Sequence, residues 1–178
     1  DFGAGDDSLS NAGTIHLNAS TISFGSDSTV GNQFVNTGLI TVVGTNAITM
    51  ITGTSANPNT FTNNGMLNFQ NGVVGDSLAI TGNFAGNGTI NMDVSRVHGT
   101  SDQLQIVGNV LAGSVNTVNV HVLDDPTVAS TIIPLVTVTG TSVAGSFVLG
   151  KVVQDKSFLE LSDVLLTNID PGNTSSDV

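Results

Sequence analysis

The tetrapeptide Gly75-Asp76-Ser77-Leu78 matches a serine-esterase signature, in which the serine attacks a carbonyl carbon. Acyl transfer of this kind needs a histidine to accept the serine proton and an acid to orient that histidine. The last histidine of the chain is His121, and no Asp-x-x-His sequence follows it. The same Asp-x-Leu-x-Ile frame recurs from Asp102 with Gln103 in place of the serine. A structural repeat therefore explains the motif better, and we predict no catalytic residue.

Metal-binding patterns are also weak in this sequence. The chain has no cysteine, and none of its histidines has the i, i+2 or i, i+4 spacing of a zinc site. The histidines are His16, His98 and His121. Oxygen ligands suited to calcium occur at Asp6-Asp7, at Asp124-Asp125 and in the turn from Gly99 to Asp102. No Gly-Gly-x-Gly-x-Asp calcium repeat is present, so we predict no metal and no cofactor.

The charge balance excludes several classes of partner. Three Lys and Arg residues stand against fourteen Asp and Glu residues, which gives a net charge of −11. Such a surface repels nucleic acid and anionic membranes, so we expect neither as a partner. A polysaccharide lyase needs clustered acidic residues and a Lys or Arg base on one face of the β-helix. The basic residues here are Arg96, Lys151 and Lys156, which are too few to support that mechanism. We therefore expect a protein without enzyme activity.

A residue-level repeat organises the first half of the chain. The segment NAGTIHL from Asn11 recurs as NTGLITV, NNGMLNF and GNGTINM, and the shared glycines are spaced by 25, 27 and 23 residues. These glycines are Gly13, Gly38, Gly65 and Gly88. A leucine or phenylalanine stands four residues before each glycine, at Leu9, Phe34, Phe61 and Phe84. Repeats of this length without helix formers are typical of a β-solenoid or a propeller.

Stacked coils of a solenoid place equivalent residues above one another. We therefore predict one interior ladder of Ile15, Ile40, Leu67 and Ile90, and a second of Leu17, Val42, Phe69 and Met92. The Asn-x-Gly segments should form one corner, where left-handed backbone conformations are tolerated best. A β-sandwich is the alternative, but it gives no reason for a residue-level repeat near 25. The predicted fold is all-β, a right-handed single-stranded parallel β-helix.

The pattern changes after about residue 110, where longer β-rich runs replace the repeat. An exposed last coil needs a cap over its edge and its apolar core. We therefore predict β-helix coils over residues 1–110, a C-terminal β-rich cap over residues 111–167 and a disordered or linker tail over residues 168–178.

Three consecutive segments carry a family resemblance. They are GDSLAITGNFAGNGTINMDV from Gly75, SDQLQIVGNVLAGSVNTVNVHVL from Ser101 and STIIPLVTVTGTSVAGSFVLG from Ser130. Their order resembles the C-terminal passenger region of pertactin-like autotransporters of Gram-negative bacteria, which use type V secretion. The resemblance implies a right-handed β-helix ending in an autochaperone module. It also implies export through the periplasm and outer membrane to the cell surface, and a C-terminal outer-membrane translocator barrel as partner, which this chain lacks.

Two functions fit this interpretation. The first is a non-catalytic stem and folding nucleus that supports translocation and folding of the passenger as a monomer. The folding core would then comprise Leu104, Ile106, Val118, Val120, Ile133, Leu135, Phe147 and Phe158. The second is an adhesin or self-association module whose polar outer faces bind host glycans or another β-helix. The ligand-binding residues of that alternative are unknown.

Overall fold

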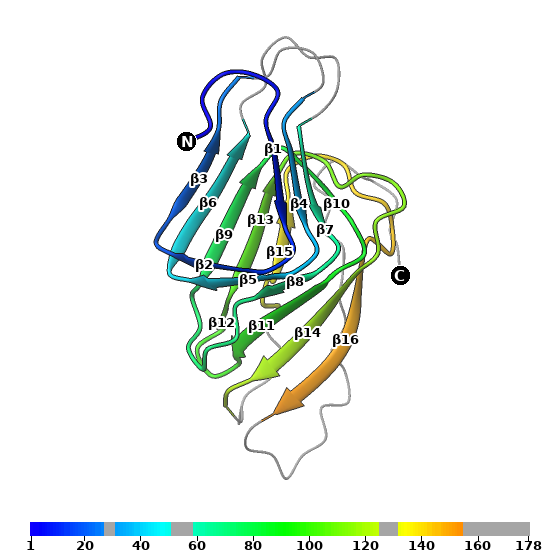
Figure 1. Ribbon diagram of the computed structural model, residues 1–178. Helices are drawn as coiled ribbons and strands as arrows, with labels where there is room; N and C mark the ends of the chain where they lie inside the picture. The colour runs from blue at the N-terminus through cyan, green and yellow to red at the C-terminus, as the bar shows by residue number, and fades with distance from the viewer. Residues whose placement is uncertain (27–30, 51–58, 125–131, 155–178) are drawn as a thin grey trace.

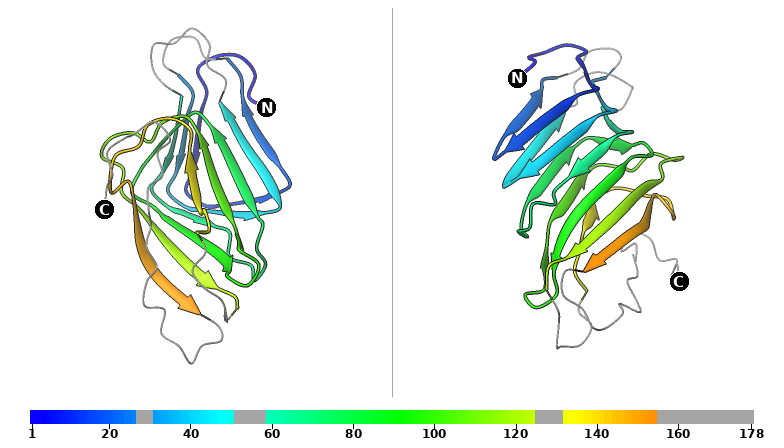
Figure 2. Two further views of the ribbon diagram at one scale, coloured as in Figure 1. Left: turned by 180° about the vertical axis from the view of Figure 1, so that it is seen from behind. Right: turned by 60° about the horizontal axis from the view of Figure 1, so that its bottom comes forward.

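The computed structural model describes residues 1–26, 31–50, 59–124 and 132–154, which contain β-strands and no helix. The strands visit three sheets in turn, so the chain winds into a solenoid of stacked coils (Figure 1). Two further views show the coils stacked one upon the next from the N-terminal end (Figure 2). The predicted class, an all-β parallel β-helix, is confirmed.

Each of the first four coils contributes one strand to each sheet. Sheet A contains β1 (Ser8–Asn11), β4 (Gln33–Asn36), β7 (Thr60–Asn63) and β10 (Asn83–Ala85). Sheet B contains β2 (Thr14–Asn18), β5 (Leu39–Val43), β8 (Met66–Asn68), β11 (Thr89–Ser95), β14 (Asn116–Val122) and β16 (Phe147–Gln154). Sheet C contains β3 (Thr21–Phe24), β6 (Thr45–Met50), β9 (Ser77–Thr81), β13 (Gln103–Val107) and β15 (Val136–Val138). All these neighbours pair in parallel, whereas β12 (Thr100–Ser101) pairs antiparallel with β11.

Coils are numbered here from the N-terminus. Coil 1 comprises β1, β2 and β3, and coils 2, 3 and 4 begin at β4, β7 and β10. Among its described residues, coil 5 bridges to sheet A through Val110, beside Phe84, and then continues as β14 and β15. Strand β16 opens coil 6. The described residues after 110 therefore stack on sheets B and C as further coils, and their action as a cap stays a prediction.

The interior ladder of sheet B is confirmed by the strand register. Ile15 lies beside Ile40, Ile40 beside Leu67, and Leu67 beside Ile90. The same column continues through Val118 to Leu149. In the second ladder Leu17 pairs with Val42, Met92 pairs with Val120, and Phe69 is buried.

A column of aromatic rings runs through sheet A. Leu9, Phe34, Phe61 and Phe84 are in register, as the repeat indicates. The rings of Phe34 and Phe61 meet edge to face with centroids 4.9 Å apart, and those of Phe61 and Phe84 are 5.7 Å apart. Phe84 lies 6.0 Å from Phe147 of coil 6. Each such pair adds about 0.5–1.5 kcal/mol to the burial of the rings, so the column ties the two ends of the core together.

Asparagine side chains form a buried ladder beside this column. The Nδ2 atom of Asn11 donates to Oδ1 of Asn36 at 2.8 Å, and Nδ2 of Asn36 donates to Oδ1 of Asn63 at 2.9 Å. In coil 4 glycine takes the asparagine position, and Asn116 Nδ2 donates to the carbonyl oxygen of Gly86 at 2.9 Å. A buried amide must be hydrogen-bonded, so the ladder fixes the vertical register of the coils.

The repeated glycines stand at this corner for a reason that differs from the sequence prediction. None of Gly13, Gly38, Gly65 and Gly88 has a positive φ, and neither does any asparagine before them, so the expected left-handed corner is wrong in these coils; Gly86, in the asparagine position of coil 4, has a φ of 113°. A Cβ on Gly65 would instead lie 2.2 Å from the carbonyl oxygen of Gly38, and one on Gly38 would lie 2.1 Å from that of Gly13. Glycine is required because the backbones of successive coils approach closely here.

Gly65→Ala should lower the free energy of unfolding by about 1–3 kcal/mol, because the new methyl group would overlap the carbonyl of Gly38. Urea unfolding followed by circular dichroism measures the loss. Gly13→Ala is the matched control, since a Cβ there meets only Oδ1 of Asn11, at 4.0 Å. This control should be neutral or slightly stabilising, because alanine restricts the unfolded chain. Equal losses in both variants would contradict the close-approach explanation.

Candidate functional site

The most polar part of the interior is the corner between sheets B and C. Strand β11 extends past β8 here, and a turn joins it to the antiparallel strand β12 (Figure 1). Three buried aspartates and one histidine meet at this point. This group, called the aspartate corner below, consists of Asp76, Asp93, Asp102 and His121.

Asp102 is the centre of the aspartate corner. Its side chain is fully buried between coils 3 and 4. Oδ1 accepts the backbone N–H groups of Gly75 and Asp76, each at 3.1 Å, and Oδ2 accepts that of Asp93 at 2.7 Å. Burial raises the pKa of Asp102 from 3.8 to about 6; the hydrogen bonds from Asp93 and Asp76 oppose the rise, and the charges of these two carboxylates add to it.

The other two aspartates extend the network to neighbouring coils. Oδ1 of Asp76 accepts the N–H of Gly44, in coil 2, at 2.6 Å. Oδ2 of Asp93 accepts the N–H groups of Asn71 and Gly72 at 2.9 and 2.8 Å, and its Oδ1 lies 2.9 Å from Nδ1 of His121, in coil 5. Coils 2 to 5 are thus joined by one continuous set of charge-assisted hydrogen bonds, which are stronger than neutral ones.

Asp124 holds the adjoining hairpin in a similar way. Its Oδ1 accepts the N–H of Arg96 at 2.8 Å, and its Oδ2 accepts the hydroxyl of Ser95 at 2.5 Å. Burial acts to raise the pKa of Asp124, but hydrogen bonds from Ser95, Val97 and Arg96 outweigh it and hold the pKa below 3.8. Ser95 Oγ also lies 2.8 Å from Nδ1 of His98.

The Ser95, His98 and Asp124 group does not have the arrangement of a catalytic triad. In a triad the histidine lies between the serine and the acid. Here the serine lies between the other two, and His98 Nδ1 is 3.9 Å from Asp124. Ser95 is also buried, which keeps a substrate carbonyl away from it. The geometry closes a turn and supplies no activated nucleophile.

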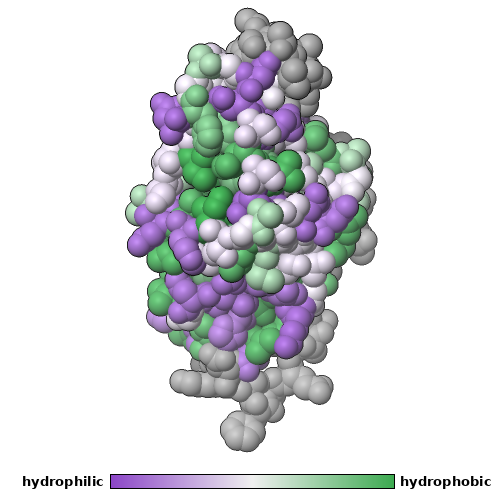
Figure 3. All heavy atoms as spheres, viewed as in Figure 1, coloured by the Kyte–Doolittle hydropathy of each residue, from purple (hydrophilic) through white to green (hydrophobic). Residues whose placement is uncertain are grey.

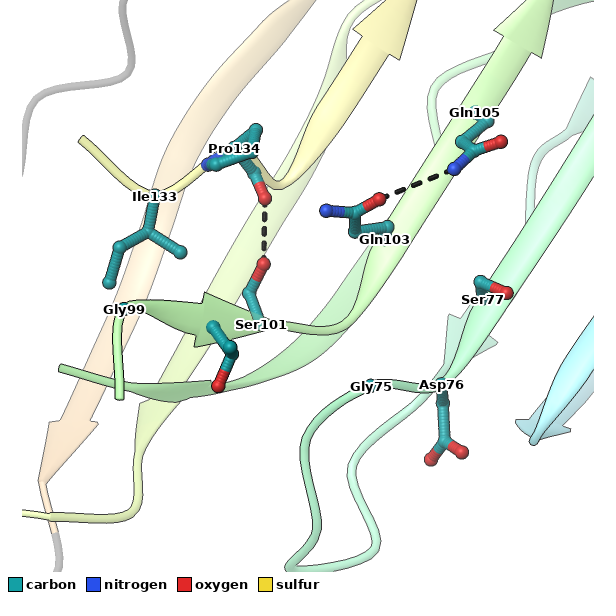
Figure 4. A pocket seen from close by; sticks show the side chains of 10 residues that line it. Gly75, Asp76, Ser77, Gly99, Ser101, Gln103, Gln105, Ile133 and Pro134 are labelled. Carbon is teal, nitrogen blue, oxygen red and sulfur yellow. Dashed lines mark hydrogen bonds between the residues drawn. The ribbon is translucent and has the colours of Figure 1, made fainter. Parts of the chain in front are cut away.

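A shallow hollow of about 350 Å³ lies on the outer side of sheet C, beside the aspartate corner (Figure 4). Gln103 and Gln105 project from β13 along one side and are joined by a 3.3 Å hydrogen bond. Ser101 Oγ donates to the carbonyl oxygen of Pro134 at 2.6 Å on the other side. Ser77, the serine of the esterase-like motif, also lines the hollow, but its lining contains no histidine, cation or aromatic ring.

The sequence-predicted folding core falls in three groups. Leu104, Ile106, Val118 and Val120 are buried. Ile133, Leu135 and Phe147 are partly buried and pack against the same core, and Phe158 lies outside the described residues. Their burial fits a core position, and their part in folding stays a prediction.

The metal candidates can be placed in part. Both carboxylate oxygens of Asp102 and of Asp124 already accept hydrogen bonds, while Asp125 lies outside the described residues. Within the described ranges no three His, Asp or Glu side chains are placed to hold a metal ion, and no helix is long and apolar enough to span a membrane.

Sequence reasoning treated Asp76 and Asp102 as repeat positions and missed the aspartate corner. A signal was present, because an aspartate precedes the same apolar strand pattern twice, 26 residues apart. The partners of these carboxylates are backbone N–H groups, which have no sequence signature.

Stacked coils of parallel strands, closed at their corners by buried amides and carboxylates, define a parallel β-helix. Among curated proteins the chain is similar to the Probable autotransporter YfaL of Escherichia coli strain K12. The two are 33% identical over 113 residues, which cover 60% of this chain and 9% of that protein. The matched region is thus a small part of the relative. No family model matches the chain, and no solved structure does.

Asp102 should make stability depend on pH. Because its pKa is about 6 in the folded chain and 3.8 ordinarily, the folded state binds this proton more tightly. Stability from this group is therefore present below about pH 3.8 and is lost as the pH rises through about 6. The full effect is on the order of 2–3 kcal/mol. Urea midpoints across this range measure it, and Asp102→Asn, which cannot titrate, should flatten the profile.

Asp124→Asn is the control for the pH profile. The pKa of Asp124 is lowered, so its contribution is present above 3.8 and is lost only at more acid pH. This variant should therefore keep the wild-type slope between pH 3.8 and 6. An unchanged slope in Asp102→Asn would show that burial of Asp102 does not control the profile.

Proposed function

We propose that this chain is a non-catalytic stem and folding nucleus of a secreted autotransporter passenger, and that it supports translocation and folding at the surface of a Gram-negative bacterium. The β-helix fold and the similarity to an autotransporter support a passenger role. The absence of an activated nucleophile or a metal cluster among the described residues fits a structural role. The partner in this proposal is the passenger's own outer-membrane translocator barrel.

The observation that carries the proposal is the direction of the hydrogen bonds at the corner between sheets B and C. Where a side chain at this corner accepts a backbone N–H from a different coil, the acceptor comes from the following coil. Asn46 accepts the N–H of Ser20 at 2.8 Å, and Asp76 accepts that of Gly44. The same direction holds for Asp102 with Gly75 and Asp76, for Asp93 with Asn71 and Gly72, and for Asp124 with Arg96 and Val97.

This direction matters for a chain that emerges C-terminus first. A buried N–H without a partner costs about 1–3 kcal/mol, so a coil is incomplete until the following coil supplies its acceptors. In C-terminal-first folding each new coil meets acceptors already in place. The corner between sheets A and B shows the reverse, because Asn64 of coil 3 accepts the N–H of Asn87 and Asn87 of coil 4 accepts that of Val115. The proposed folding direction thus rests on the bonds between coils on the aspartate side of the solenoid, where the carboxylate acceptors are.

Two deletions of similar size test the proposal. A fragment of residues 59–178 lacks coils 1 and 2, and a fragment of residues 1–112 lacks β14, β15 and β16. We expect the first to give a cooperative urea transition and a β-sheet circular dichroism spectrum. The second should be unfolded or aggregated, because the acceptors at Asp124 and the end of the apolar core are missing. Folding of residues 1–112 with the full-length midpoint would overturn the proposal.

The alternative, an adhesin or self-association module, has one observation in its favour. On the outer face of sheet B, Asn119 Nδ2 donates to Oδ1 of Asn91 at 2.9 Å, and Asn91 Nδ2 donates to Oδ1 of Asn68 at 3.2 Å. Hydrophilic residues gather over the lower part of the face in Figure 3, with hydrophobic ones above them. This ordered row of amides could face glycans or a second β-helix.

Sedimentation velocity at rising concentration separates the two functions. A stem should remain monomeric at every concentration. Self-association through the amide row should increase the sedimentation coefficient and should be weakened by Asn91→Lys, which places a charge in the row. Association that is insensitive to Asn91→Lys would exclude this row as the interface.

A further inference from the structure

The sequence contains three Asn-Gly pairs, at Asn64-Gly65, Asn71-Gly72 and Asn87-Gly88. In such a pair the backbone nitrogen of glycine can attack the Cγ atom of the asparagine side chain. A N–Cγ bond forms, the bond from Cγ to the amide nitrogen breaks, and ammonia leaves with the proton of the glycine N–H. Water then opens the succinimide ring to aspartate or isoaspartate. The reaction needs no other reagent, so the local structure decides its rate.

The attacking nitrogen is least restrained at Asn64-Gly65. In the equivalent positions of the coils before and after, Gly38 N–H donates to the carbonyl oxygen of Asn11 at 3.0 Å and Gly88 N–H to that of Asn63 at 2.9 Å. Within the described part of the chain, the N–H of Gly65 has no hydrogen-bond acceptor. A hydrogen bond to a carbonyl opposes loss of the proton, so Gly65 has the more available nucleophile.

The Cγ atom of Asn64, which the glycine nitrogen attacks, is also activated. The side chain of Asn64 is exposed, and its Oδ1 accepts the N–H of Asn87 at 3.2 Å. A donor at this oxygen stabilises the negative charge that develops there as the glycine nitrogen adds to Cγ. The exposed side chain leaves ammonia an open path to solvent.

The other two pairs lack one of these features. At Asn87, Oδ1 accepts the N–H of Val115 at 2.9 Å, but Gly88 N–H is bonded. At Asn71, Gly72 N–H donates to Asp93 at 2.8 Å, and Asn71 Nδ2 donates to Asp76 at 2.7 Å. Asn71 and Gly72 lie in an exposed bend, so exposure to solvent alone would favour the Asn71 site.

We propose that Asn64 is a site of spontaneous deamidation and isoaspartate formation in the folded protein, and that the Asn71 and Asn87 sites are protected by their hydrogen bonds. Isoaspartate would insert a methylene group into the backbone next to Gly65. The backbone has no room for it, because even a Cβ on Gly65 would lie 2.2 Å from the carbonyl oxygen of Gly38. Modification therefore loosens the contact between coils 2 and 3 and limits the working life of the solenoid.

The test is to incubate the full chain in its folded state at mildly alkaline pH. Peptide mass spectrometry then gives the conversion of each asparagine with time, and isoaspartyl methyltransferase labelling identifies isoaspartate. Asn64 should react roughly two- to tenfold faster than Asn87, which is the effect of one backbone hydrogen bond. In the same chain unfolded in urea, all three asparagines should deamidate at similar rates. This control would show that the difference in the folded chain comes from structure and not from the local sequence.

The variant Asn64→Gln removes the reactive pair and keeps the side-chain amide. Aged wild-type protein should develop a population with a lower urea midpoint, and aged Asn64→Gln should not. Asn71 or Asn87 reacting first in the folded chain would overturn the proposal. Equal rates at Asn64 and Asn87 would overturn it too, because the Gly65 N–H would then confer no advantage.

Discussion

A coil of this solenoid cannot satisfy its own backbone. Its strands run parallel to those of the coils above and below, so the N–H and C=O groups of each strand pair with neighbouring coils. At the corners the backbone N–H and C=O groups also need hydrogen-bond partners, but no neighbouring strand supplies them. Side chains of adjacent coils supply these partners instead. The need to complete each coil from its neighbours explains the repeated sequence, because every level must present the same groups at the same height.

The polar composition follows from this requirement. Asn36 and Asn63 are fully buried, and their side-chain amides hydrogen-bond to each other in the ladder. At another corner, the side chains of Asn32 and Asn59 accept backbone N–H groups of the preceding coil. Much of the asparagine that suggests a glycan-binding surface is thus used inside the molecule. At the B–C corner Asn46 accepts one N–H in coil 1, and aspartates take this position in later coils, where the two oxygens of Asp93 and Asp102 accept two and three N–H groups.

The sequence contained enough to predict the columns, because a period of two and a repeat near 25 together place Ile15, Ile40, Leu67 and Ile90 at one height. The role of Gly65 could not be predicted from the sequence. The close approach of two backbones depends on the distance between stacked coils, and its only trace in the sequence is the glycine itself. The aspartate corner was missed because Asp93 and His121, 28 residues apart, meet only after coils 4 and 5 have stacked. The Asp-x-Leu-x-Ile frame indicated a repeat and gave no sign that its carboxylates would be buried.

The most direct test of the account is native-state hydrogen exchange of the full chain, resolved by segment. If acceptors supplied by following coils hold the solenoid together, amides at the B–C corner of coils 3 and 4 should exchange last. Those amides include Gly75, Asp76 and Asp93, together with strands β11 and β14. Protection of backbone amides from exchange should fall toward coil 1, because among the described residues there is no earlier coil to which it supplies acceptors. Slowest exchange in β2 and β3, with early exchange at Asp76 and Asp93, would contradict the account.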